Sequence, residues 1–293
     1  MGIAKTRSPA ACSSLLARPN DMFERTSSPS APRILLHSHD SFGLGHLRRT
    51  LTLAEALRLR LPQAQILLTT GSPCATHFEA HPGIDVVKLP SVTKNASGEY
   101  VPRTLGGELD PLLRLRRQML SEIHRTFAPD LLVVDHQVLG LCDELSDVLR
   151  EARTLGTRTI LGVRDIIDTP DTVAREWGRP RARRALAEEY DRVCVYGSPD
   201  VFDTRREYPI PPELEARVEF VGYIARPAPQ PGRKTRAGRL AQKHVLVTVG
   251  GGEDGESRIE TYLEALELAP VPWRTTIVLG PLADAARARA FKR

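Results

Sequence analysis

The sequence predicts an α/β protein with a doubly wound parallel sheet in its first domain, followed by a second, incomplete domain of the same Rossmann-like kind. Three observations predict this fold class. Apolar runs alternate with helical segments from Arg33 onward, the runs show no clean polar alternation, and the pattern restarts after a Pro-, Gly- and Arg-rich segment. Strands that alternate with helices are typical of parallel βαβ units. Continuously apolar strands are typical of sheets that helices cover on both faces.

The first domain is predicted to span residues 32–224, after an extension at residues 1–31 that is rich in Ser, Pro, Ala and Arg and is predicted to be disordered. Seven apolar runs are predicted to be its strands: Arg33–His39, Gln65–Thr70, Ile84–Leu89, Asp130–Asp135, Thr157–Val163, Arg192–Tyr196 and Val218–Tyr223. Four segments between them are predicted to be helices: Leu47–Leu61, Leu109–Phe127, Cys142–Leu155 and Asp171–Tyr190.

Residues 225–243 are rich in Pro, Gly and basic residues and are predicted to be a linker. The pattern then restarts in residues 244–293. We expect two strands (His244–Val249 and Thr275–Leu279), a helix between them (Ser257–Leu268) and a second helix from Asp284. A sheet of two strands is marginal alone. We therefore expect this segment either to dock on the first domain or to be the start of a second domain that is truncated.

The composition indicates which kinds of partner, such as nucleic acid or membrane, the protein is expected to bind, and in which cellular compartment it is expected to be. The formal net charge is +5, but aromatic residues are only 5% and do not alternate with basic runs, so no nucleic-acid surface is expected. The four cysteines are far apart and predict free thiols rather than a metal site, which favours a cytoplasmic location. No apolar stretch is long enough to span a membrane. Gly2 with Thr6 fits a loose myristoylation pattern, so peripheral membrane contact stays open.

A glycine-containing loop follows the first predicted strand, in the segment HDSFGLGHLRRT (His39–Thr50). Ligands of open α/β sheets bind at the carboxyl ends of the strands. Gly43 and Gly45 allow a sharp turn and a close approach to a ligand. The free N–H groups of the next helix favour an anion. The loop therefore predicts a phosphate-binding site.

The first turn of that helix carries His46, Arg48 and Arg49. Cations at a helix N-terminus oppose the macrodipole and cost roughly 0.3–1 kcal/mol each. A bound phosphate would offset this cost, which makes Arg48 and Arg49 candidate phosphate ligands. The alternative is that both arginines point to solvent. Because an imidazole titrates near neutral pH, His46 is the first candidate for a general base or an acceptor-binding residue.

Two other nucleotide-binding classes do not fit this loop. A dinucleotide fingerprint needs a third Gly or Ala where Arg48 stands, and an acidic residue at the end of the second strand, which here ends in Thr70 and Gly71. A phosphate-binding P-loop needs Gly-Lys-Ser/Thr, which is absent.

Polar residues also follow two later strands. Asp135 and His136 come at the end of the apolar run DLLVVD, and we take Asp135 as a second catalytic candidate and His136 as a binding candidate. Arg164 and Asp165 follow the next strand and are further binding candidates. The alternatives are that Asp135 caps the loop and that Arg164 and Asp165 form a local ion pair.

The string SHDSFGLGHLRR resembles a branch of predicted bacterial glycosyltransferases, and its GxGH loop resembles that of family 28, which includes the N-acetylglucosaminyl transferase of peptidoglycan synthesis. Four more motifs support the resemblance: LLVVDH (Leu131–His136), GVRDIID (Gly162–Asp168), VYGSPDVFD (Val195–Asp203) and FVGYIAR (Phe220–Arg226). The resemblance implies a GT-B fold and inverting transfer of a hexosyl group from a nucleotide-sugar to an acceptor of unknown identity. It implies no resident cofactor and no metal.

The second glycine loop, VGGGEDG, follows the first strand of the second domain. The resemblance implies that this loop faces the nucleotide-sugar phosphates, with Gly250, Gly251 and Gly252 as backbone donors. Glu253 and Asp254 would repel a diphosphate unless they point away. The alternative is a tight turn in which Asp254 caps the helix.

Two other functions remain open at this stage. The first is a nucleotide-sugar epimerase or hydrolase of the same fold, which would use carboxylates near the anomeric centre. The second is a truncated, non-catalytic remnant that binds a phosphorylated ligand.

Overall fold

The computed structural model describes residues 31–39, 44–78, 81–95, 97–208, 210–226, 243–252, 255–269, 271–284, 289 and 291. The predicted N-terminal extension lies outside this set except for Ala31. The same holds for most of the predicted linker.

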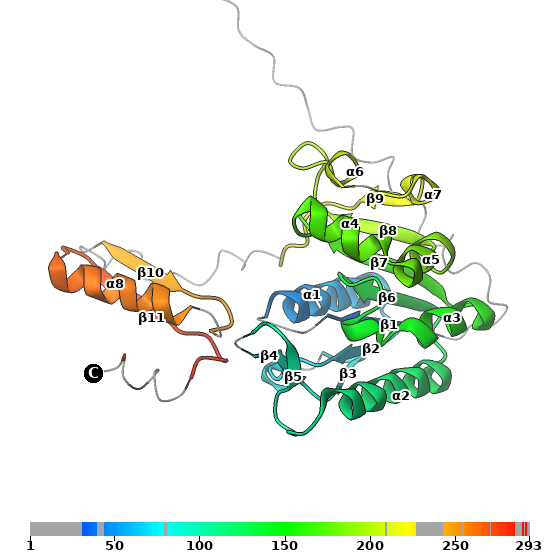
Figure 1. Ribbon diagram of the computed structural model, residues 1–293, viewed down its shortest axis with the longest axis horizontal. Helices are drawn as coiled ribbons and strands as arrows, with labels where there is room; N and C mark the ends of the chain where they lie inside the picture. Colours follow the sequence, from blue (N-terminus) through cyan, green and yellow to red (C-terminus); the bar gives the residue numbers. More distant parts are fainter. Residues whose placement is uncertain are drawn as a thin grey trace, which may run out of the picture.

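A seven-stranded parallel sheet with the order β3-β2-β1-β6-β7-β8-β9 forms the centre of the first domain (Figure 1). Its strands are β1 (Arg33–Ser38), β2 (Gln65–Thr70), β3 (Ile84–Lys88), β6 (Leu131–Asp135), β7 (Arg158–Arg164), β8 (Arg192–Tyr196) and β9 (Val218–Phe220). All seven predicted strands are confirmed, and with them the doubly wound fold class. The strands β2 and β3 are added on one side of β1, and the chain then crosses to the other side, where β6 to β9 are added in sequence order.

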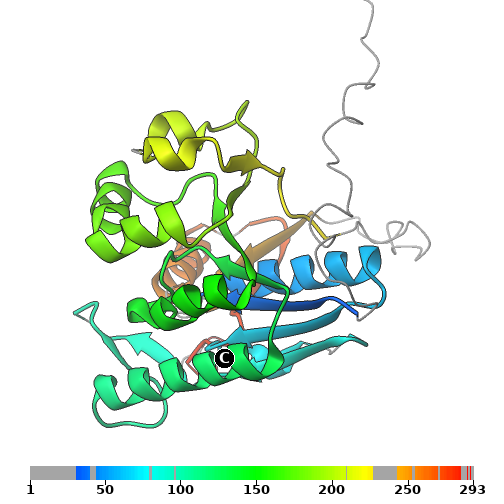
Figure 2. The ribbon, with the colours of Figure 1, turned by 90° about the vertical axis from the view of Figure 1, so that its right-hand side faces the viewer.

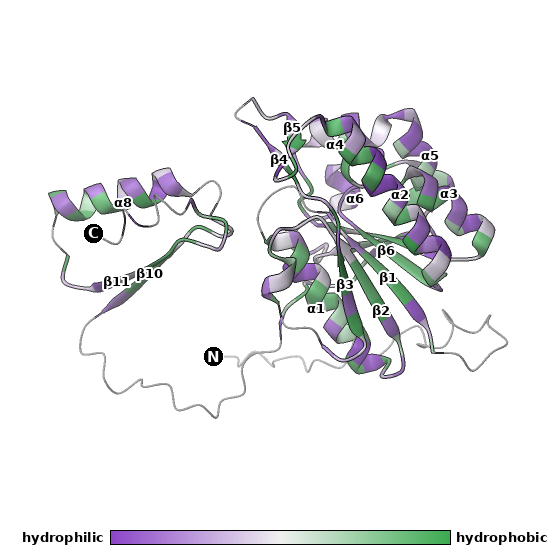
Figure 3. Ribbon diagram, turned by 90° about the horizontal axis from the view of Figure 1, so that it is seen from below, coloured by the Kyte–Doolittle hydropathy of each residue, from purple (hydrophilic) through white to green (hydrophobic). Residues whose placement is uncertain are grey.

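Helices cover both faces of the sheet, as the apolar strands predict. Ile34 and Leu36 of β1 pack against α1 (Gly45–Arg60), whereas Leu35 belongs to a second cluster that includes residues of α2 (Leu109–Phe127). Successive side chains of a strand point to opposite faces, which explains this division. In Figure 3 the strands are green between helices that carry purple residues on their outer sides.

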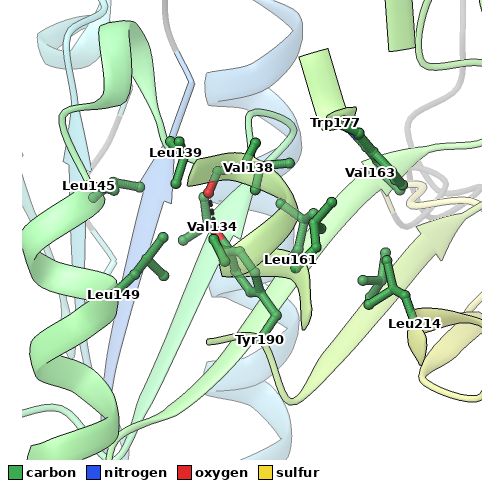
Figure 4. Close-up of a cluster of buried hydrophobic side chains, with 14 of the residues drawn as sticks. Val134, Val138, Leu139, Leu145, Leu149, Leu161, Val163, Trp177, Tyr190 and Leu214 are labelled. Atoms are coloured by element: carbon green, nitrogen blue, oxygen red, sulfur yellow. Dashed lines mark hydrogen bonds between the residues drawn. The ribbon is translucent and has the colours of Figure 1, made fainter. Parts of the chain in front are cut away.

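The second cluster continues under α3 (Ser146–Leu155), α4 (Pro170–Gly178) and α5 (Pro180–Glu188). Figure 4 shows Tyr190 beside Val134 and Leu161 within this cluster. The Tyr190 hydroxyl donates a hydrogen bond of 2.6 Å to the Val138 carbonyl. A buried phenol needs such a partner, because an unpaired hydroxyl in an apolar core is costly.

The predicted helix Cys142–Leu155 is wrong at its start, because α3 begins only at Ser146. Cys142 and Asp143 have positive φ angles of 48° and 61°, which interrupt the helical backbone. The preceding residues form a short 3₁₀ helix, η2 (Leu141–Asp143).

The predicted helix Asp171–Tyr190 is also wrong, because two helices, α4 and α5, replace it. Arg179 separates them with an extended backbone (φ −58°, ψ 134°) and Pro180 opens α5. A proline disfavours helical geometry in the residue before it and is well tolerated in a first turn.

A small antiparallel hairpin, β4 (Val92–Lys94) and β5 (Tyr100–Pro102), is absent from the sequence prediction. Its strands are only three residues long, which is too short for a periodic signal. Val92 packs with Leu112 and Leu113 of α2, so the hairpin lies beside the start of that helix (Figure 2, turquoise). Three further short helices are η1 (Ala75–His77), α6 (Thr204–Glu207) and α7 (Pro212–Glu215).

A buried ionic network joins α2 to the turn before α3. Arg116 donates from Nε and Nη2 to the two Glu144 oxygens at 2.6 and 2.8 Å, and from Nη1 to the Pro90 carbonyl at 2.6 Å. His37 Nε2 of β1 lies 3.3 Å from Glu144 Oε1. Burial alone would raise the pKa of Glu144, but hydrogen bonds from His37 and Arg116 hold it at about 2. Glu144 is therefore an ionised buried carboxylate at neutral pH.

The segment after the predicted linker contains β10 (His244–Thr248), α8 (Glu256–Leu268) and β11 (Arg274–Val278). The two strands pair in parallel and α8 connects them, which confirms these three predicted elements. The helix predicted from Asp284 lies mostly outside the described residues. The domain boundaries themselves stay predictions. Within the described part of the chain, no helix combines the length and the apolarity needed to cross a bilayer.

Candidate active site

Four polar side chains lie close together at the point where the strand order reverses. Three of them were predicted site residues, and the fourth is His39. β1 leads into α1 on one face of the sheet, and its neighbour β6 leads toward α3 on the other. Ligands of open α/β sheets bind at such a reversal, outside the carboxyl ends of the strands. His39 and His46 follow β1, and Asp135 and His136 come at the end of β6. α1 begins at Gly45, two residues earlier than predicted, so that His46 lies in its first turn.

His46 and Asp135 form a hydrogen-bonded pair, with His46 Nδ1 2.6 Å from Asp135 Oδ2. Burial would raise the pKa of Asp135, but the hydrogen bond from His46 and the charge of Arg49 offset it and place the pKa below its usual value. An ionised carboxylate only accepts hydrogen bonds, so His46 Nδ1 carries the proton, and Arg49 Nη2 lies 2.9 Å from that nitrogen without donating to it. The second ring nitrogen, Nε2, makes no hydrogen bond within the described structure.

Arg49 holds the same carboxylate from a second side. Its Nε and Nη2 donate to Asp135 Oδ1 at 2.9 and 2.7 Å. Its guanidinium also lies 5.5 Å from the ring centre of Tyr196 on β8. Asp135 therefore accepts three hydrogen bonds from two side chains, which compensates for its burial. It does not cap the loop, which was the alternative for this residue.

His39 and His136 pack around His46. The ring centres of His46 and His136 are 4.9 Å apart, and those of His39 and His46 are 5.3 Å apart. Burial first, and then the nearby His46, lower the pKa of both flanking histidines to about 3. Both are therefore neutral at physiological pH. His136 has a φ of 68°, a left-handed conformation that is uncommon for a residue other than Gly and is enriched at functional sites.

The pKa of His39 predicts an acid-sensitive stability. Above pH 6.5 the imidazole is neutral in both folded and unfolded chains. As the pH falls below 6.5, His39 becomes protonated in the unfolded chain, whereas in the folded protein it stays neutral until the pH approaches its pKa of about 3. At pH 5 this imbalance should cost about 2 kcal/mol of unfolding free energy. We expect urea unfolding to show a larger loss between pH 7.5 and 5 in the wild type than in His39→Gln. Equal losses in the two proteins would contradict the assignment.

A cavity of about 390 Å³ adjoins the histidine cluster. It lies between α1, the ends of β7 and β8, and the segment after β9. Its lining includes Gly45, Arg48, Arg49, Arg164, Asp165 and Arg226. Five of these six were predicted to bind phosphate or substrate from the sequence, and the structure brings them together around one space.

Arg164 and Asp165 do not form the local ion pair that was the alternative for them. Arg164 Nη2 donates to the Ile167 carbonyl at 3.0 Å, whereas Asp165 Oδ2 accepts from the Tyr223 hydroxyl at 2.8 Å. Asp165 thus fixes the segment after β9 against the end of β7, and Arg164 keeps most of its donors available.

The remaining predicted site residues lie elsewhere. Gly43 falls outside the described residues. Gly250, Gly251 and Gly252 form the turn between β10 and α8, and none of them lines this cavity. Gly252 has a φ of 98°, and a Cβ there would meet the Leu279 carbonyl oxygen at 2.3 Å. Close packing thus accounts for Gly252, and a phosphate role for the three glycines stays a prediction.

Several residues at the site were not predicted from the sequence, among them His39, Tyr196 and Arg226. His39 opens the glycine-loop segment at the carboxyl end of β1, and Tyr196 ends β8, so both stand at positions where ligand-binding residues are expected. Arg226 closes the FVGYIAR motif. Their positions in the sequence were typical of ligand-binding residues, but only the folded sheet shows which strand ends are neighbours.

Comparison with known proteins gives a likeness of fold. No family model matches the chain, and no curated protein matches it. A UGT2 structure from Phytolacca americana, complexed with UDP-2fluoro-glucose and pterostilbene, has a TM-score of 0.52 at 13% identity and covers 87% of this chain and 72% of that one.

Two other solved structures are similar to this chain. UGT71G1 of Medicago truncatula, complexed with UDP-glucose, has a TM-score of 0.48 at 12% identity and covers 89% of this chain and 70% of its own. The calicheamicin glycosyltransferase CalG4 has a TM-score of 0.46 at 17% identity, with coverage of 87% and 67%. The seven-stranded parallel sheet and the likeness to the UGT2 structure show a Rossmann-like α/β fold that matches GT-B glycosyltransferase structures. The narrower resemblance to family 28 stays a prediction.

Proposed function

We propose that this protein transfers a hexosyl group from a nucleotide-sugar to a hydroxyl acceptor, with inversion at the anomeric carbon. The observation that carries the proposal is the His46–Asp135 hydrogen bond, which engages Nδ1 and leaves Nε2 without a partner in the described structure, at the ligand-binding edge of the sheet. The shared fold supports it, and the UDP-2fluoro-glucose named in the UGT2 structure supports a nucleotide-sugar as donor.

The geometry suits a single displacement. His46 Nε2 accepts the proton of the acceptor hydroxyl while the oxygen bonds to the anomeric carbon. The bond from that carbon to the diphosphate breaks, and the nucleoside diphosphate leaves with the electron pair. Asp135 holds the imidazole in the reactive tautomer and stabilises the imidazolium that forms. One displacement on one face of the sugar inverts its configuration.

The epimerase or hydrolase alternative has less support. Such an enzyme would act through carboxylates near the anomeric centre. The two described carboxylates of this region are already engaged, Asp135 by His46 and Arg49 and Asp165 by Tyr223. The arrangement therefore favours a histidine base over a carboxylate nucleophile.

A thermal-shift screen followed by a transfer assay tests the proposal. We expect at least one UDP- or dTDP-sugar to raise the Tm, because a ligand that binds only the native state stabilises it. With that donor, α-linked in the nucleotide-sugar, NMR should show a β-linked product with a hydroxyl acceptor. An α-linked product, free sugar formed equally well without acceptor, or no stabilisation by any nucleotide-sugar would contradict the proposal.

A further inference from the structure

Three arginines from separate parts of the chain converge on the cavity beside the histidine cluster. Arg48 comes from α1, Arg164 from the end of β7 and Arg226 from the segment after β9. Among the described residues, Arg48 and Arg226 make no ion pair or hydrogen bond through their guanidinium groups. Arg164 makes one hydrogen bond, to a backbone carbonyl.

Some surface arginines of this chain bind carboxylates. Arg125 binds Glu151 and Arg179 binds Asp143, each through two guanidinium nitrogens. Arg48, Arg164 and Arg226 have no carboxylate partner within the described chain, and what distinguishes them from other unpaired arginines such as Arg114 is that they line one cavity.

The charge of the cavity is positive. Arg49 also lines it, but its charge is balanced by Asp135. Asp165 is the one described carboxylate of the lining, and it accepts from Tyr223. The first turn of α1 carries no acidic residue, so the helix terminus adds further positive potential. Cations gathered in this way are stabilised by an anion of matching geometry.

We propose that this cavity is a phosphoryl-group site, in which Arg48, Arg164 and Arg226 bind the phosphate oxygens of a substrate. Guanidinium groups recognise phosphate by paired hydrogen bonds, and a volume of about 390 Å³ holds a phosphoryl group together with part of the molecule that carries it. The proposal rests on the proposed function for its place in the reaction.

The site lies next to the proposed base. Gly45 lines the cavity and directly precedes His46, and Arg49 lines it while holding Asp135. A phosphate bound here would place the rest of its molecule at His46 Nε2. Two molecules carry such a group: a phosphorylated acceptor, and the donor with its diphosphate.

Calorimetry with inorganic pyrophosphate tests the site without turnover. We expect the wild-type protein to bind pyrophosphate, and Arg48→Ala, Arg164→Ala and Arg226→Ala each to raise the Kd at least tenfold. Arg114→Ala, which removes an exposed arginine of α2 outside the lining, should leave the Kd unchanged. The proposal is overturned if the wild type does not bind pyrophosphate, or if all four variants bind it as the wild type does.

Competition then identifies the source of the phosphate, and either result upholds the site. Displacement of pyrophosphate by UDP assigns the cavity to the donor. Displacement by glycerol 3-phosphate, with UDP bound at the same time, assigns it to a phosphorylated acceptor. The two proposals fail separately. Glycosyl transfer without arginine-dependent pyrophosphate binding would contradict only the phosphoryl-group site. Arginine-dependent pyrophosphate binding without glycosyl transfer would contradict only the proposed catalytic function.

Discussion

Glutamine in place of His46 should lower kcat for glycosyl transfer by about 10²–10⁴-fold, the usual contribution of a general base. Glutamine retains an amide of similar length but cannot accept the proton of the acceptor hydroxyl. His46 is partly exposed and belongs to none of the apolar core clusters, so the fold should remain. The measurement is steady-state transfer with the donor selected by thermal shift, together with a thermal melt of the variant.

The matched control is His81→Gln. His81 is an exposed histidine that contacts Glu55, away from the sheet edge, and its loss should leave kcat unchanged. A His46→Gln enzyme with wild-type kcat would remove His46 from the role of base.

The partnership with Asp135 has its own signature. Because the two residues act as a unit, their effects on kcat should not add. The double variant His46→Gln with Asp135→Asn should have a kcat close to that of His46→Gln alone. NMR of the imidazole nitrogens should show the proton on Nδ1 of His46 in the wild type. Finding it on Nε2 instead would contradict the tautomer that the mechanism requires.

Methionine in place of Arg116 should lower the unfolding free energy by about 3–5 kcal/mol, because it leaves a buried charge uncompensated. Glu144 would lose both guanidinium hydrogen bonds and keep the contact with His37 and the hydrogen bond from the Leu141 backbone N–H. Urea unfolding at pH 7, where Glu144 is ionised, measures this effect.

Two comparisons separate the buried charge from the arginine itself. Arg125→Met removes a partly exposed pair with Glu151 and should cost less than about 1 kcal/mol. The double variant Arg116→Met with Glu144→Leu should recover most of the lost stability, because no charge remains buried. A double variant as unstable as Arg116→Met alone would show that packing, and not charge, accounts for the loss.

Much of the fold could be predicted from the sequence because buried parallel strands are locally visible. Each strand is an apolar run between helical segments, and all seven were found on that basis. The errors arose where a backbone feature overrides the side-chain pattern. Pro180 divides an otherwise continuous helical pattern, and the positive φ angles of Cys142 and Asp143 delay the start of α3.

The site could be predicted only residue by residue. His46 and Asp135 were separate candidates because each follows a strand, but their 2.6 Å contact depends on β1 and β6 being neighbours in the sheet. Arg116 was invisible for a different reason. An arginine within an amphipathic helix is normally exposed, and its burial depends on Glu144, which reaches it from a left-handed turn.

The strand order also bears on how such a protein can diversify. His46 and Asp135 lie 89 positions apart in the sequence, and the chain between them includes the hairpin β4–β5 and the whole of α2. This part of the chain forms β2 on one side of β1 and ends in β6 on the other side. Doubling the length of a loop adds only about 0.6 kcal/mol to the cost of closing it. Insertions at the hairpin tip can therefore accumulate in descendants and reshape what the molecule recognises, while the reactive pair keeps its spacing.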